Sequence, residues 1–199
     1  MIMDFIKKIP KYVWVVSIIF LTLFIAINIL AQKETEDIKD SRYNIVCFFG
    51  MNRIMVALLE YSEMEGNNLY FPSDLKVLLE KGYLKDENIL YCQDDKKPYH
   101  YIAGLRKDMP SDCPIFWESS IPHTYNYKGS VIKYGRVMRL DSTISFIKDD
   151  DYKDFAKSIE VLEQVLKSED LNFLRKVENS REYKSFTKDM AKWKISRIK

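Results

Sequence analysis

The longest run of apolar positions in this chain lies near its N-terminus, over residues 12–31, with lysines close to both ends. Thirteen of these residues are Val, Ile, Leu or Phe, and their insertion free energies sum to roughly −4 to −8 kcal/mol. A helix of about 20 residues covers roughly 30 Å, the thickness of the hydrocarbon core of a bilayer. The pattern therefore predicts one transmembrane helix over 12–31, preceded by a cytoplasmic tail at 1–11.

A cleaved signal peptide is the alternative for this segment. The apolar region of a signal peptide is normally about 7–15 residues long, and this run is longer. Ile29 and Ala31 nevertheless have the character of weak −3 and −1 cleavage residues, so the alternative stays open.

The orientation of the span rests on the charges beside it. Three lysines precede the run, and two lysines and an arginine follow it within a short distance, so the Lys/Arg count is a tie. The tight cluster of lysines before the span, together with the free amino terminus, favours an N-terminus in the cytoplasm and a domain outside it.

The helical pattern continues beyond the apolar run. Residues 32–44 are charged and compatible with a helix, residues 45–61 are apolar again, and Gly66-Asn67-Asn68 is a strong stop signal. We expect a continuous helix from about 12 to 64. Its second apolar stretch predicts a face for helix packing with protein partners, made of Phe48, Met51, Ile54, Met55, Leu58 and Tyr61.

The rest of the chain reads as a small antiparallel sheet followed by helices, an α+β class. A short helix is expected at 74–81 and an amphipathic helix after Asp149, with a further one from about 169. Residues 92–98 and 119–130 read as loops. The strands are expected at 99–103, 114–118, 135–140 and 143–147, the last two joined by a turn at Asp141-Ser142. The predicted organisation is a globular domain at 32–148 with a helical C-terminal extension at 149–199.

Composition limits the partners and cofactors that this chain is expected to bind. The net charge of +2 provides no field that would steer nucleic acid, so no nucleic-acid partner is expected. Of the three cysteines, Cys92 and Cys113 lie in loop-like stretches and are the favoured disulfide pair, while three free, packed thiols are the alternative. No CxxC motif occurs and only two histidines are present, so we expect no zinc site and no other metal or cofactor.

Neither histidine argues for catalysis. His100 lies between two tyrosines on a predicted strand and is expected to be exposed on the opposite face from them. His123 follows a proline in a loop and is the better candidate for a base or ligand. A nucleophilic role for a cysteine needs a nearby histidine, which the sequence alone does not place. We expect no catalytic residue and no enzyme activity.

The middle of the chain resembles the pilin-like, type II secretion pseudopilin G-like family, in particular prepilin-type proteins of planctomycetes and lentisphaerae. The resemblance rests on the order of several motifs. They are the stretch from Cys47 to Tyr61, Tyr70-Phe-Pro-Ser-Asp-Leu75, Tyr99-His-Tyr-Ile-Ala-Gly-Leu105, Pro110-Ser-Asp-Cys-Pro114, and the hairpin Val137-Met-Arg-Leu-Asp141.

The resemblance implies a pilin fold, in which a long N-terminal transmembrane helix packs on a small antiparallel sheet. It also implies a single-pass protein of the bacterial inner membrane with its globular domain outside the cytoplasm, serving a structural or assembly role in secretion or a surface filament. The chain departs from the family pattern in four respects. No glycine precedes Tyr12 as a cleavage site, and residues 12–31 contain no acid. Asp141-Ser142 replaces the Asp-Gly of the hairpin, and the acidic calcium-binding loop of secretion pseudopilins has no clear counterpart. A monomeric, membrane-anchored binding module that uses loops 92–98 and 119–130 or the C-terminal helices is the alternative.

Overall fold

The computed structural model describes residues 11–127 and 130–198, with side chains at 21–28, 45–125 and 130–198. The chain forms two compact units, Met1–Arg42 and Tyr43–Lys199. The boundary between them falls at 42/43, eleven residues later than the end of the predicted span.

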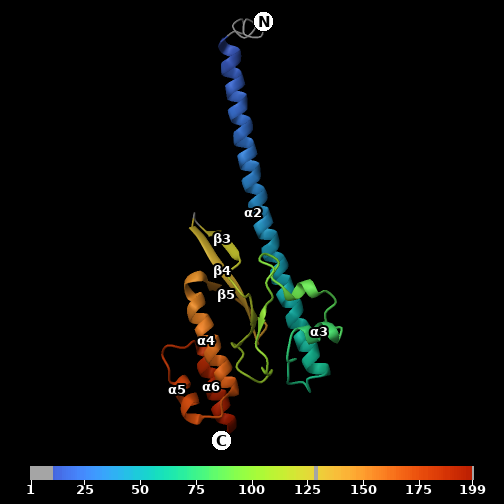
Figure 1. Ribbon diagram of the computed structural model, residues 1–199, viewed down its shortest axis with the longest axis vertical. Helices are drawn as coiled ribbons and strands as arrows, with labels where there is room; N and C mark the ends of the chain where they lie inside the picture. The colour runs from blue at the N-terminus through green and yellow to red at the C-terminus, as the bar shows by residue number, and fades with distance from the viewer. Residues whose placement is uncertain (1–10, 128–129, 199) are drawn as a thin grey trace. The chain divides into compact units, whose positions relative to one another are not determined.

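The first helix, α2 (Lys11–Met64), is continuous over 54 residues, as the sequence predicts (Figure 1). It ends where Asn67 and Asn68 take left-handed backbone angles of φ +52° and +59°. Asparagine is among the few non-glycine residues that adopt this conformation readily, so these two residues account for the predicted end of the helix.

One stretch of α2, Ile45–Met64, is long and apolar enough to cross a membrane among the residues whose side chains are described, with a mean hydropathy of 1.4. A signal sequence or the core helix of a soluble domain has the same composition. Of this stretch, 39% is buried inside the protein. Met51, Ile54 and Leu58 are each 0% exposed, so the stretch contributes the core helix of the second unit.

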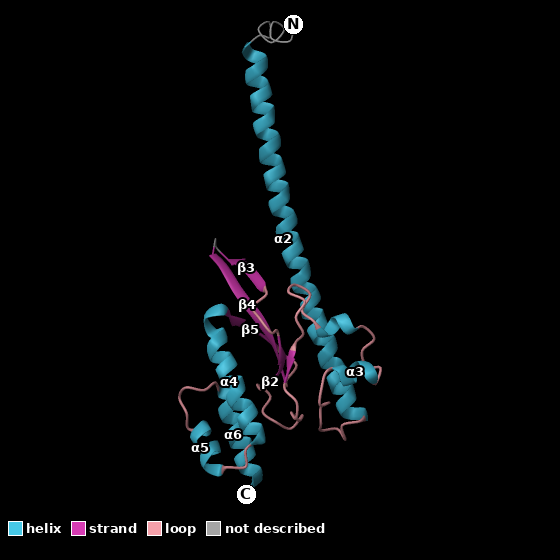
Figure 2. Ribbon diagram, viewed as in Figure 1, coloured by secondary structure: helices cyan, strands magenta, loops and turns pink. Residues whose placement is uncertain are grey.

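The second unit contains a five-stranded antiparallel sheet (Figure 2). Strand β4 is central, with β2 and then β3 along one edge and β5 along the other. The short β1 pairs with β2. The strands are β1 (His100–Tyr101), β2 (Pro114–Trp117), β3 (His123–Tyr127), β4 (Ser130–Arg139) and β5 (Ile144–Lys148).

Four of the five strands fall in or overlap predicted segments, and the turn between β4 and β5 is the expected one, with Ser142 at φ +66°. Strand β3 is a correction, because it lies inside the stretch expected to be the loop 119–130. Thr124, Tyr125 and Tyr127 belong to residue types that are enriched in strands, but the run is only five residues long. In the sequence it lies between Pro122 and Gly129, residue types that favour turns, which is why the whole stretch reads as a loop. Pairing along β4 over five residues holds β3 in the sheet.

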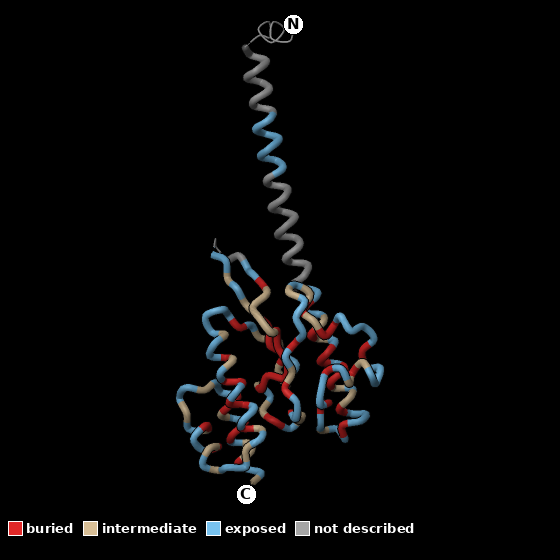
Figure 3. The backbone as a smooth tube through the Cα atoms, viewed as in Figure 1, coloured by how far each residue is buried: buried red, intermediate tan, exposed pale blue. Residues whose placement is uncertain are grey.

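The sheet is covered on both faces, with α2 on one side and the C-terminal helices on the other, while α3 (Lys76–Glu80) lies beside α2 (Figure 1). All four residues of β2 are buried in consequence, which is typical of a strand with two covered faces. Figure 3 shows the buried residues following the sheet and the helix faces that flank it. A short 3-10 helix, η1 (Glu87–Leu90), lies between α3 and β1.

The C-terminal helices are α4 (Asp149–Lys167), α5 (Leu171–Glu178) and α6 (Ser185–Ile198). The ring of Trp117 on β2 contacts Phe155 of α4 edge-on at 5.7 Å, and Phe155 contacts Phe186 of α6 at 6.2 Å. The segment expected to be an extension therefore belongs to the same compact unit as the sheet. Helix α5 is capped by Asp170, whose Oδ1 accepts from the Asn172 amide at 2.9 Å.

The expected partner-packing face of α2 requires correction in the same way. Met51, Ile54, Met55 and Leu58 are buried in the domain's own core, and Tyr61 packs against that core. Phe48 is 42% exposed and belongs to a different face. The exposed apolar residues of this part of α2 are Ile45, Val46, Phe48, Phe49 and Val56.

Candidate functional site

The folded domain brings together two thiols, a carboxylate and an imidazole that lie far apart in the sequence. Cys47 comes from α2, Cys92 follows η1, Glu118 follows β2, and His123 begins β3. Each of these four residues is only 1% exposed. Their four potential ligand atoms all lie within 4.8 Å of one another.

The contacts inside this cluster are short. The Sγ atoms of Cys47 and Cys92 are 3.6 Å apart, and Cys92 Sγ lies 4.0 Å from His123 Nε2. His123 Nε2 is 2.6 Å from Glu118 Oε1. The Gln93 backbone amide donates to Cys47 Sγ over 3.2 Å. Four different elements thus meet at one buried polar centre.

Two charged residues flank the cluster. Asp94 Oδ2 lies 2.5 Å from His123 Nδ1, the ring nitrogen that faces away from Glu118. Arg136 of β4 is 3% exposed, and its Nη1 lies 3.3 Å from Glu118 Oε1 and 2.8 Å from His123 Nε2. The Arg136 backbone amide also donates to Glu118 Oε2 over 2.7 Å.

The groups of the cluster shift one another's pKa values. Burial disfavours the charged imidazole, but hydrogen bonds with Cys47 and Glu118 and the Glu118 charge outweigh it and raise the pKa of His123 to about 9. The hydrogen bond from the Cys92 thiol lowers the pKa of Cys47, with help from His123 and the Gln93 amide. The pKa of Cys92 is raised, first by this same hydrogen bond and then by burial. One of the two thiols therefore ionises well before the other.

His123 Nε2 has conflicting neighbours within this geometry. A nitrogen that accepts a hydrogen bond from Arg136 Nη1 has its lone pair directed at that donor. A nitrogen that donates to Glu118 Oε1 carries a proton that faces the guanidinium instead. The ring cannot satisfy both contacts with one lone pair or one proton.

The expected Cys92–Cys113 disulfide is corrected by the structure. Cys92 lies beside Cys47, and Cys113 Sγ lies 3.7 Å from the Phe186 carbonyl oxygen on the α6 side of the sheet. All three cysteines are free thiols. The sequence signal failed because two loop-like stretches that are close in sequence need not lie close together in the fold.

His100 behaves as expected. It is exposed on β1 and stacks on Trp117 with ring centroids 5.4 Å apart. Its neighbour Tyr99 is buried, and the Tyr101 hydroxyl donates to the Pro72 carbonyl oxygen over 2.7 Å. His123 is not the loop residue expected but the first, buried residue of β3.

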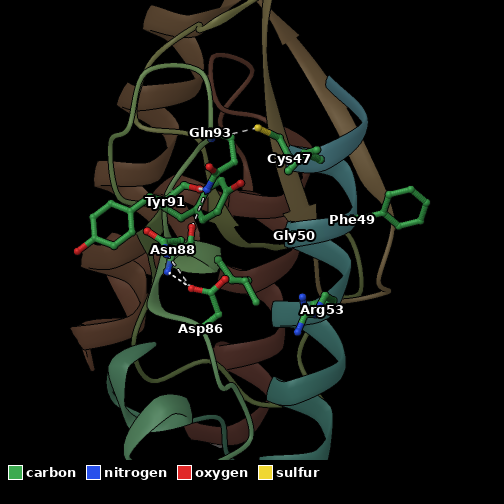
Figure 4. Close-up of a pocket in the computed structure, with 11 residues that line it drawn as sticks. Cys47, Phe49, Gly50, Arg53, Asp86, Asn88, Tyr91 and Gln93 are labelled. Atoms are coloured by element: carbon green, nitrogen blue, oxygen red, sulfur yellow. Dashed lines mark hydrogen bonds between the residues drawn. The ribbon is translucent and has the colours of Figure 1, made fainter. Parts of the chain in front are cut away.

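A groove of about 450 Å³ lies beside the cluster, between α2 and the η1 region. Figure 4 shows Phe49 and Arg53 on the α2 side, Asp86 and Asn88 on the other, and the bond between Gln93 and Cys47 at one end. Most of the other residues around it are apolar or aromatic, among them Val46, Ile89, Tyr91 and Tyr99. The groove is continuous with the exposed apolar residues of α2, because Val46 and Phe49 belong to both.

A second, apolar recess of about 330 Å³ lies on the sheet itself. Arg136 pairs with Phe146, and Tyr134 lies two residues before Arg136 on β4. These three side chains therefore share the face of the sheet that carries the buried cluster. The recess is lined by Tyr125, Ile132, Tyr134, Phe146 and Lys148.

Comparison of the chain with protein-family models, with curated proteins and with solved structures finds no match.

Proposed function

We propose that this protein is a single-pass, membrane-anchored envelope protein with a pilin-like structural or assembly role. Its domain lies outside the cytoplasm of a bacterial cell. The observation that carries the proposal is the division of one continuous helix, α2, into two apolar parts with different surroundings. Residues 21–28 are all exposed, whereas the core of Tyr43–Lys199 is built around residues 47–58.

The exposed part supports the anchor at 12–31. Five large apolar side chains in this part are between 49% and 66% exposed, and water would make that exposure costly. A bilayer removes the cost. The polar side chain Asn28 donates to the Phe24 carbonyl oxygen over 2.7 Å, which reduces the cost of placing its amide in or near lipid. The five residues are Leu21, Leu23, Phe24, Ile25 and Ile27.

The second part supports an assembly role through a surface different from the one the sequence suggests. Phe49 and Val56 lie seven residues apart, two helical turns along one face of α2, and are 61% and 55% exposed. The groove between α2 and η1 runs alongside. A helix of a neighbouring subunit, laid against this face, would bury both side chains.

Membrane attachment is tested by fractionation of cells that produce the full-length chain, followed by alkaline extraction and mass spectrometry of its N-terminus. An anchored protein resists extraction and keeps residues 12–31. A protein released into the soluble fraction, or one cleaved after Ala31, contradicts the anchor.

Subunit packing is tested by a photo-crosslinking amino acid at Phe49 or at Val56, with the exposed Glu160 of α4 as the matched control. We expect adducts at multiples of the chain mass from the two α2 positions and none from the α4 position. If neither α2 position gives an adduct larger than the single chain, the assembly role is rejected, while the proposed membrane anchor is unaffected.

The recess on the sheet favours a second candidate, the monomeric binding module. Tyr125 and Phe146 line this recess and are 54% and 63% exposed, and exposed apolar side chains gathered in one place mark interaction sites. A crosslink from Phe146 to a protein of different mass, which disappears in Tyr125→Asp while Phe49 gives no self-adduct, would favour this role over assembly.

A further inference from the structure

We propose that Cys47, Cys92, Glu118 and His123 form a structural zinc site that fastens the sheet to α2. The inference goes beyond the proposed function, because it concerns how the domain is held together and does not depend on anchoring or assembly. It rests on the identity of the four ligand atoms, their spacing, their burial and the residues around them.

The donor set suits zinc. Two sulfurs, one imidazole nitrogen and one carboxylate oxygen are all ligands that Zn²⁺ accepts in tetrahedral sites. Calcium and magnesium prefer all-oxygen sites, which thiols do not supply. Softer sulfur together with imidazole selects a transition metal, and zinc is the common tetrahedral choice.

The spacing is close to what a tetrahedral ion requires. Two sulfurs bonded to one zinc at about 2.3 Å lie roughly 3.8 Å apart, and the Sγ atoms of Cys47 and Cys92 are separated by 3.6 Å. The largest separation among the four ligand atoms is within 4.8 Å. Glu118 Oε1 and His123 Nε2, at 2.6 Å, are the pair that must move apart, by well under 1 Å.

The surrounding residues are those that orient and balance a zinc site. Histidine ligands usually donate the other ring N–H to a carboxylate, and Asp94 Oδ2 lies 2.5 Å from His123 Nδ1. Nδ1 is buried and has no aligned hydrogen bond in the structure. A rotation of the ring or of the carboxylate would align the two groups, and that bond would fix the tautomer that leaves Nε2 free to bind the metal. The Gln93 amide, 3.2 Å from Cys47 Sγ, supplies the N–H···S bond that a ligated thiolate accepts.

Arg136 has a role in the same arrangement. Two thiolates and a carboxylate carry three negative charges, and a divalent ion leaves one uncompensated. The buried guanidinium, 3.3 Å from Glu118 Oε1, neutralises it. An ion between Nε2 and Oε1 also removes the conflict at Nε2, because the lone pair then binds the metal and Arg136 Nη1 can donate to Glu118 Oε1.

The site is closed to solvent, which is typical of a structural zinc site rather than a catalytic one. All four ligand residues are 1% exposed, and a catalytic zinc keeps a coordination position open to water or substrate. The ligands come from α2, the segment after η1, the end of β2 and the start of β3. Zinc would therefore hold the start of β3 and the end of β2 against the core helix.

The test measures zinc in the full-length chain purified in detergent without chelator and dialysed against metal-free buffer. We expect about one zinc per chain by plasma mass spectrometry. Cys47→Ser, Cys92→Ser and His123→Gln should each lose most of it. Cys113→Ser is the matched control, because it removes a buried thiol that lies outside the cluster and should leave the metal content unchanged.

Two further measurements keep the inference falsifiable if a variant fails to fold. Replacement of zinc by Co²⁺ in the unmodified chain should give the intense thiolate charge-transfer band and the visible bands of a tetrahedral site. After chelation and denaturation without reductant, all three thiols should react with a thiol reagent. A metal-free protein without cobalt bands overturns the inference, and so does a native Cys47–Cys92 disulfide, which would leave only Cys113 reactive.

Discussion

The two faces of the central sheet differ in what they bury. The face toward α4 and α6 buries aromatic rings against one another, with Trp117, Phe155 and Phe186 in a continuous series. The face toward α2 buries Met51 and Leu58, but also Glu118, His123 and Arg136. Apolar burial is non-directional and tolerates rearrangement, whereas buried charges require particular partners at particular distances. One face thus supplies stability, and the other fixes which elements meet.

Removal of the C-terminal helices gives the sharpest test of this contrast. A chain that ends after Lys148 would expose Trp117 and Cys113, both now buried, together with the β5 residue Ile147. We expect the folded domain to be lost, which limited proteolysis of the detergent-solubilised chain would show as rapid cleavage within 43–148. A protease-resistant fragment of that size would instead support the extension predicted by sequence.

A single substitution on the apolar face should cost less. Phe155 is 5% exposed and contacts rings on β2 and α6, so Phe155→Ala should lower the free energy of unfolding by about 4 kcal/mol. Urea denaturation followed by tryptophan fluorescence measures the change. Phe146→Ala, which alters a ring that is 63% exposed on β5, is the control and should change stability by roughly 0.5 kcal/mol or less. Equal effects would contradict the assigned burial.

The substitution Arg136→Met tests the polar face of the sheet, because it removes the charge and keeps a side chain of similar length. Loss of the guanidinium leaves Glu118 buried with one fewer positive partner, so we expect a loss of about 3 kcal/mol in the free energy of unfolding. The double variant Arg136→Met, Glu118→Gln should recover part of that loss, since it removes the uncompensated charge. No recovery would mean that the two side chains do not act as a pair.

Asp94→Asn should have the smallest effect on folding and a specific effect on metal. The amide keeps the shape of the side chain but weakens the contact that orients His123, so zinc affinity should fall about 10- to 100-fold. Competition with a chromophoric chelator measures the affinity. The exposed substitution Asp150→Asn on α4 is the control, and an equal fall there would remove Asp94 from the site.

Local sequence signals were enough for the elements themselves. The continuity of α2, its stop at Asn67 and Asn68, and the amphipathic helix after Asp149 all depend on residues close in sequence. Helix periodicity, capping and turn chemistry act over a few residues, so these features could be read without knowledge of contacts. Strand β3 could not, because it is a short run between turn-type residues and it is its five-residue pairing with β4 that defines it.

The chain's sequence by itself determined that one long helix carries two apolar segments, and that a small antiparallel sheet and further helices follow. Only the tertiary structure decided which apolar faces are used internally, that Cys47 meets Cys92 rather than Cys92 meeting Cys113, and that His123 lies against Glu118. Cys47 and His123 are separated by 76 residues, and no periodic pattern extends over such a distance. Their meeting results from chain topology and from burial on both faces of one sheet.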